Sequence, residues 1–132
     1  MKKWKTRYAE VIRIGDIEEE GVYNLLSSLF QEAGLMDVLE GLDALRTSIN
    51  KRGISARAIE ALASRLNENR WWGVGFCHHR TQSGNITVTR SNEGEVSLHI
   101  GLANYRGAGR SIEIDLGPQG KKVWALLSRR AK

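Results

Sequence analysis

The chain of 132 residues contains one cysteine, Cys77, and one proline, Pro118. A lone cysteine cannot form a disulfide within the chain, so a disulfide-rich secreted scaffold is excluded and a reducing compartment is favoured. No apolar run is long enough for a transmembrane helix or for the core of a signal peptide, and no segment is of low complexity. We therefore expect a cytoplasmic protein without a membrane partner.

The remaining composition is that of a folded domain. Hydrophobic residues make up 41% of the chain and charged residues 27%, which is close to the average for globular proteins. At this length one hydrophobic core can support folding without a metal or a disulfide. We expect a single domain over residues 1–132.

The hydrophobic periodicity predicts the order of the elements. Apolar residues recur at helical spacing over residues 16–69 and alternate over 71–117, which indicates helices followed by antiparallel strands. A basic strand in residues 1–15, covering Tyr8 to Ile14, and a basic C-terminal helix in 118–132 complete the prediction. The fold class is therefore α+β: a two-layer domain with three consecutive helices packed on an antiparallel sheet of four to five strands, and a short C-terminal helix.

Two finer predictions concern local structure. Asp16, with Glu19 three residues later, has the pattern of a capping box and predicts the start of the first helix. Compact turns at residues 83–85 and 92–94 predict hairpins that join the first three strands of the 71–117 region.

Charge is distributed unevenly along the chain. The net charge of +5 divides into +4 for residues 1–13, −7 for residues 14–50 and +8 for residues 51–132. An acidic helical block thus lies between two basic segments. Two interpretations remain open: either the block faces a partner, or it neutralises basic neighbours within the fold.

Three stretches combine basic residues with aromatic residues. Arginine and lysine neutralise phosphates, tyrosine can stack on a base, and glycine allows close backbone approach. Two of these stretches are the basic termini of the chain. The third covers residues 101–110 and also contains several glycines. The predicted nucleic-acid-binding residues are Lys2, Lys3, Lys5, Arg7, Tyr105, Arg106, Arg110, Lys121, Lys122, Arg129 and Arg130.

A protein interface is predicted from different residues. Trp71 and Trp72 enter a strand together, and since neighbouring side chains point to opposite faces, one ring can join the core while the other faces outward. An exposed tryptophan and an acidic cluster are both candidate partner contacts. The predicted interface residues are Glu18, Glu19, Glu20 and Trp72.

Cysteine and histidine raise the question of a metal or catalytic site. On the predicted sheet Cys77, His79 and His99 share the polar face, and His78 points to the other. Neither a CxxC nor an HxxxH spacing is present, and a fourth zinc ligand is missing. We therefore expect no metal, no cofactor and no catalytic residue. A ribonuclease set of His79 or His99, Glu113 or Asp115, and Arg80 or Arg110 is a lesser alternative.

These patterns favour a small, non-enzymatic nucleic-acid-binding protein with an accessory or regulatory role. The alternative is an inhibitor from a phage or mobile element, of the counter-defence kind, that binds a nucleic-acid-handling machine through the acidic helices. In that case the partner is a protein rather than nucleic acid.

Overall fold

A six-stranded antiparallel sheet forms one layer of the protein, in the order β1-β2-β4-β5-β6-β3. The computed structural model describes residues 1–50, 53–76, 83–102 and 110–131. The strands are β1 (Lys2–Lys5), β2 (Ala9–Asp16), β3 (Trp72–Phe76), β4 (Asn85–Ser91), β5 (Val96–Gly101) and β6 (Arg110–Asp115).

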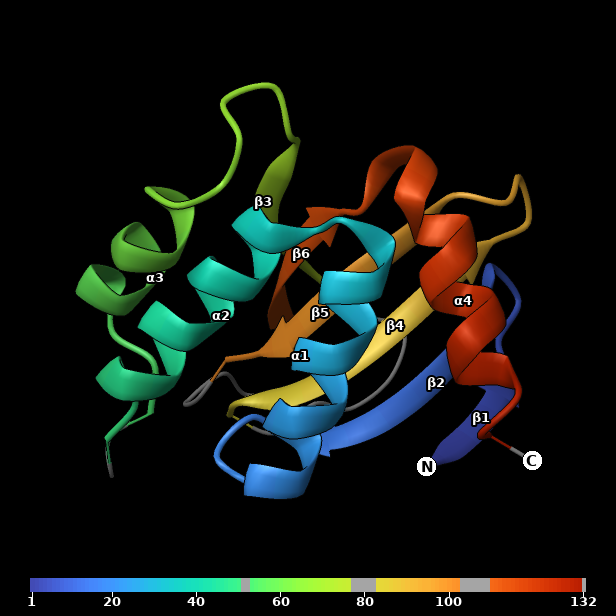
Figure 1. The fold of residues 1–132 in the computed structure, drawn as a ribbon, viewed down its shortest axis with the longest axis horizontal. Helices are drawn as coiled ribbons and strands as arrows, with labels where there is room; N and C mark the ends of the chain where they lie inside the picture. Colours follow the sequence, from blue (N-terminus) through green and yellow to red (C-terminus); the bar gives the residue numbers. More distant parts are fainter. Residues whose placement is uncertain (51–52, 77–82, 103–109, 132) are drawn as a thin grey trace.

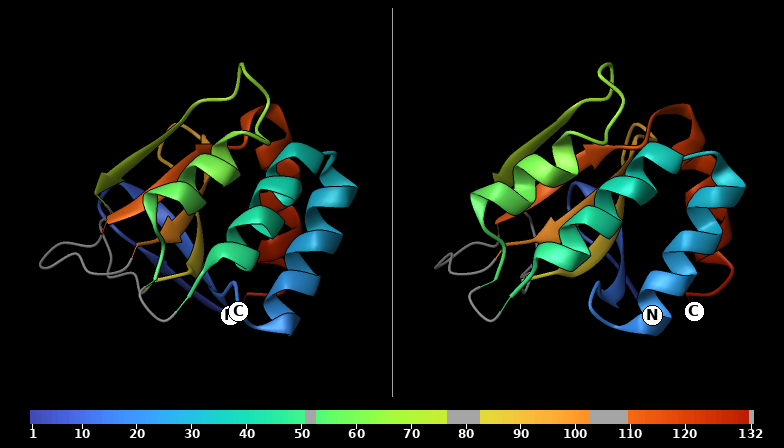
Figure 2. Two further views of the ribbon diagram at one scale, coloured as in Figure 1. Left: turned by 90° about the vertical axis from the view of Figure 1, so that its left-hand side faces the viewer. Right: turned by 60° about the vertical axis from the view of Figure 1, so that its left-hand side comes forward.

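The helices form the second layer and lie on one face of the sheet (Figure 1, Figure 2). They are α1 (Glu20–Ala33), α2 (Met36–Ser48), α3 (Ala56–Ala63) and α4 (Gly120–Ser128), and a 3₁₀ turn, η1 (Gly117–Gln119), leads into α4. Within the described ranges, no helix is long and apolar enough to cross a membrane. The α+β class, the three consecutive helices and the short C-terminal helix are confirmed.

The strand register produces two apolar rows that the helices cover. Cross-strand partners place one row across β2, β4, β5 and β6, and a second row across β4, β5 and β6. All seven side chains have no solvent exposure: Ile12, Val88, Leu98 and Ile114 in the first row, and Ile86, Ile100 and Ile112 in the second. This burial explains why the alternating pattern was readable from the sequence.

Three detailed predictions are wrong. The sheet has six strands rather than four to five, because β1 pairs with β2 as an edge strand. β3 does not form a hairpin with β4; it pairs with β6 at the opposite edge. Asp16 does not begin α1, since it ends β2, and Glu19 occupies the cap position without a side-chain cap hydrogen bond.

An ion pair fastens the helical layer to the segment that enters β3. Arg70 Nε and Nη2 donate to the two carboxylate oxygens of Asp37 in α2, at 2.7 and 3.2 Å, and Nη1 donates to the carbonyl oxygen of Asp115 at 3.0 Å. The backbone amide of Asn67 also donates to Asp37, at 3.0 Å. Burial raises the pKa of Asp37, but the hydrogen bonds from Arg70 and Asn67 outweigh burial and hold that pKa below its usual value.

We expect Arg70→Ala to lower the free energy of unfolding by about 2 kcal/mol, because it leaves a partly buried carboxylate without its counter-ion. The ion pair is fully present above the unfolded-state pKa of Asp37, about 4, and its contribution is lost as pH falls through the lower folded-state pKa. Urea titrations at neutral and acidic pH measure how much the free energy of unfolding falls on acidification. Asp37→Asn should make this fall smaller.

Arg65→Ala provides the control, because Arg65 is exposed and donates to the nearby Ala61 carbonyl at 2.7 Å and to Ser64. Its effect should stay within about 0.5 kcal/mol. Equal losses for the two arginine variants would contradict a special role for Arg70.

Close packing at Gly120 fixes the start of α4 against β5. A Cβ atom at position 120 would lie 2.7 Å from Cβ of Val96 and 3.2 Å from Cβ of Leu116. Both neighbours are rigid near their backbones, so neither can give way cheaply. The missing side chain at Gly120 therefore sets how closely α4 approaches the sheet.

We expect Gly120→Ala to destabilise the fold by about 1–3 kcal/mol through overpacking. Gly21→Ala is the matched control, because nothing lies within 4 Å of a Cβ atom at this exposed helical position. There alanine should be neutral or stabilise by up to about 1 kcal/mol. Thermal unfolding of both variants measures the difference, and a stabilised Gly120→Ala protein would contradict the packing argument.

Candidate nucleic-acid interface

Two cations lie against the buried ring of Trp124 in α4. The guanidinium of Arg90 is 4.9 Å from the ring centroid and the Lys3 ammonium is 5.6 Å from it. Arg90 is in β4 and Lys3 is in β1, so three elements that are distant in the chain meet here. Distances below about 6 Å are those of cation–π contacts.

Glu10 of β2 also contacts both of these cations. Arg90 donates to its carboxylate at 3.0 Å, and Lys3 Nζ lies 3.8 Å from it. The Arg90 hydrogen bond, with the positive charges of Arg90, Lys3 and Lys5, lowers the pKa of Glu10 despite some burial. One carboxylate thus orders the cations while leaving an excess of positive charge.

Lys3, Arg90 and Trp124 line a surface pocket of about 540 Å³ between β1, α4 and the β4–β5 turn. Its lining residues are Lys3, Arg90, Gly94, Val96, Lys121, Trp124, Ala125 and Ser128. We call Lys3, Arg90, Lys121 and Trp124 the Trp124 cluster. Figures 1 and 2 show the N-terminus beside the C-terminus, so the two basic ends of the chain form one region of the surface.

The predicted basic residues divide into three groups by location. Lys2, Lys3 and Lys5 are in β1, Arg7 is exposed in the following turn, Lys121 and Lys122 are in the first turn of α4, and Arg129 and Arg130 are exposed just after it. Tyr105 and Arg106 lie outside the described residues. Arg110 begins β6, four strands from β1, about 19 Å by inter-strand spacing.

Sequence reasoning missed Arg90 and Glu10. The sequence does indicate on which face of the sheet each residue lies. Arg90 follows Ile86 and Val88 at every second position, and Glu10 is two residues before Ile12, so both point to the same face as these apolar residues. Both charged residues lie near the end of a strand, on the same face as the buried apolar side chains. Charged residues at such positions indicate where the hydrophobic core ends and a polar pocket begins.

The acidic block is partly neutralised inside the fold. Asp37 is neutralised by its ion pair with Arg70. Asp43 accepts a hydrogen bond from the Tyr23 hydroxyl at 3.1 Å, and the Arg46 guanidinium lies 4.5 Å from the centroid of the Tyr23 ring. Burial and the Asp43 contact raise the pKa of Tyr23. The three predicted interface carboxylates, Glu18, Glu19 and Glu20, are exposed before and at the start of α1, and none forms an ion pair with a described residue.

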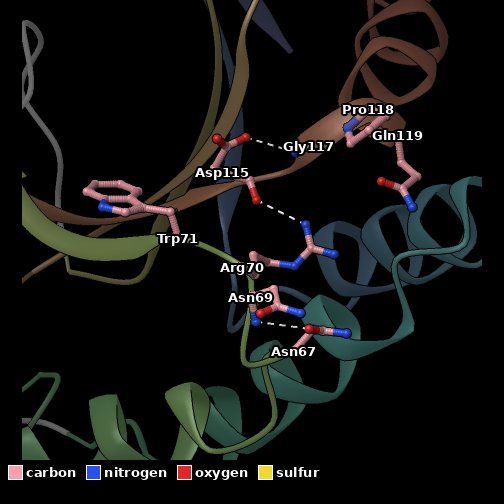
Figure 3. A pocket seen from close by; sticks show the side chains of 8 residues that line it. All are labelled: Asn67, Asn69, Arg70, Trp71, Asp115, Gly117, Pro118 and Gln119. Atoms are coloured by element: carbon pink, nitrogen blue, oxygen red, sulfur yellow. Dashed lines mark hydrogen bonds between the residues drawn. The ribbon is translucent and has the colours of Figure 1, made fainter.

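A second pocket, of about 390 Å³, lies where the chain passes from α3 to β3. Figure 3 shows Arg70 between Asp115 and the Asn67–Asn69 turn, with Trp71 on one side of the view and Gln119 on the other. The Arg70 guanidinium is occupied by Asp37 and by the Asp115 carbonyl. This pocket therefore has less free positive charge than the Trp124 cluster.

Neither of the adjacent tryptophans joins the core. Trp71 is 58% exposed and Trp72 is 37% exposed. Trp71 lies across Gly73, where a Cβ atom would approach its ring to 3.3 Å. The expectation that one ring is buried is wrong, and Trp72 is exposed as its predicted interface role requires.

His99 lies among hydroxyl groups on the polar face of the sheet. Nε2 is 2.9 Å from the Thr89 hydroxyl, Nδ1 is 3.3 Å from the Ser111 hydroxyl, and the residue is 8% exposed. This environment suits a structural histidine better than an accessible acid or base. Cys77, His78, His79 and Arg80 lie outside the described residues, and among those described no group of three potential ligands could hold a metal.

Comparison with protein-family models, with curated proteins and with solved structures finds no match for this chain.

Proposed function

We propose that this protein binds nucleic acid in an accessory or regulatory role, through the surface formed by its two basic termini. The observation that carries the proposal is the Trp124 cluster, in which Lys3, Arg90 and Lys121 surround one pocket. Residues of β1, β4 and α4 supply the cations, so folding concentrates positive charge that the sequence spreads over the whole chain.

The local electrostatics favour a phosphate backbone as the ligand. Lys121 and Lys122 occupy the first turn of α4, where the helix dipole is positive and no acidic residue is present. Both side chains are exposed, as are Arg129 and Arg130 beyond the other end of the helix. Exposed cations along one helix can contact successive phosphates, and these contacts make binding dependent on salt.

The test measures affinity for labelled oligonucleotides, single-stranded and duplex, over a range of salt concentrations. Lys121→Ala with Lys122→Ala should weaken binding roughly tenfold at low salt and reduce the salt slope by about 1.4–1.8. Arg57→Ala with Arg65→Ala is the matched control, since it removes the same charge from α3 and from the turn that follows it. If both double variants lost affinity equally, the effect would depend only on net charge and not on the position of Lys121 and Lys122.

Glu10→Gln tests the same surface in the opposite direction. The amide can still accept from Arg90, but the negative charge beside Lys3 is removed. We expect affinity to rise by a factor of about 2–5. No detectable binding at low salt by the unaltered protein would refute the proposal. The inhibitor alternative would instead be supported by a defined protein complex that charge reversal at Glu18, Glu19 and Glu20 weakens.

A further inference from the structure

The two edges of the sheet differ in how they are protected against pairing with another strand. β1, with the sequence KKWK, presents Lys2, Lys3 and Lys5 at one edge. β3, with the sequence WGVGF, carries no charge at the other edge. Lysines are a usual means by which proteins block unwanted strand addition, and a long uncharged edge invites it.

The apolar rows of the core extend onto β3 and become exposed there. Ile114 pairs with Trp72, and Ile112 pairs with Val74. Their isoleucine partners are fully buried, whereas Trp72 is 37% and Val74 is 42% exposed. With Trp71, three of the six large exposed hydrophobic side chains among the described residues fall within four positions. Such a concentration is characteristic of a binding surface.

The hydrogen-bond register leaves backbone groups available at the same residues. The Asp115 amide donates to the Trp71 carbonyl at 3.1 Å. Because donors and acceptors alternate along an antiparallel pair, the N–H and C=O groups of Trp72 and Val74 point away from β6. No described strand lies beyond β3. The edge therefore offers both backbone hydrogen bonds and apolar side chains.

We propose that β3 pairs antiparallel with β3 of a second copy of this chain, which joins two six-stranded sheets into one. A two-fold axis at Val74 makes the contact self-complementary, with Val74 opposite Val74 and Trp72 opposite position 76. No charge in β3 opposes this arrangement. The basic Trp124 cluster lies at the β1 side of the sheet, so its positive charge stays far from the contact.

The amount of apolar surface sets the expected strength. Trp71, Trp72 and Val74 expose roughly 300 Å² per copy, given the usual area of aromatic side chains. Two copies together expose roughly 600 Å² of it, so this surface supplies at most half of the 1,200 Å² or so found in stable interfaces, and backbone and neighbouring atoms must supply the rest. Because this area is small, we expect weak association, with a dissociation constant on the order of micromolar or higher.

Sedimentation equilibrium of the protein without nucleic acid, from micromolar to near-millimolar concentration, tests the proposal. The unaltered chain should pass from monomer to dimer, and Val74→Lys should raise the dissociation constant more than about tenfold by placing two ammonium groups at the axis. Val74→Thr is the matched control, since it keeps a β-branched uncharged residue and should retain most of the association. Val74 is exposed, so both variants should fold, which circular dichroism checks.

Crosslinking tests the register. Facing residues of a hydrogen-bonded antiparallel pair have Cα atoms about 5.5 Å apart, which suits a disulfide. In a Cys77→Ser background, Val74→Cys should form a covalent dimer on oxidation, and Lys2→Cys at the other edge should not. A monomer at every concentration, or a dimer that Val74→Lys leaves intact, would overturn the proposal without bearing on nucleic-acid binding.

Discussion

The register of the six strands determines which side chains the helices bury and which remain at the edges. One cross-strand row runs through the whole sheet, from Lys3 in β1 to Trp72 in β3. Its four central members are completely buried under the helical layer. A slip of one residue in any strand would move the side chains of that strand to the opposite face of the sheet. The strand register therefore determines the core, the Trp124 cluster and the exposed edge.

The helical layer could be predicted because its signals are local. Helical spacing, Gly34 in the left-handed conformation at the end of α1, and Ser55 as a side-chain cap of α3 all depend on residues close in sequence. The alternation in β4, β5 and β6 was equally clear, since those strands form the centre of the sheet. The α+β class therefore followed from the sequence alone.

The order of the strands did not follow from the sequence. β1 has little alternation of apolar residues to mark it, and it pairs because β2 offers a free edge. β3 pairs with β6 rather than with β4, the next strand in the chain. Arg70, just before β3, fixes this part of the chain to α2. Pairing between distant strands is a tertiary choice that local patterns do not encode. For the same reason, Lys3, Arg90 and Trp124 could not be brought together from the sequence.

Opposite edges of one sheet thus carry opposite kinds of surface. β1 carries three lysines, of which Lys3 contacts Glu10 and Trp124. These cations discourage strand pairing, and under the proposed function they would also attract phosphate. At β3 the core ends in exposed tryptophan and valine, with no charge to prevent a second strand from pairing. A dimer formed through β3 would place two basic surfaces at its far ends. Such a dimer could hold two phosphate backbone segments at once, and the second contact would then gain from the high effective concentration that the first provides.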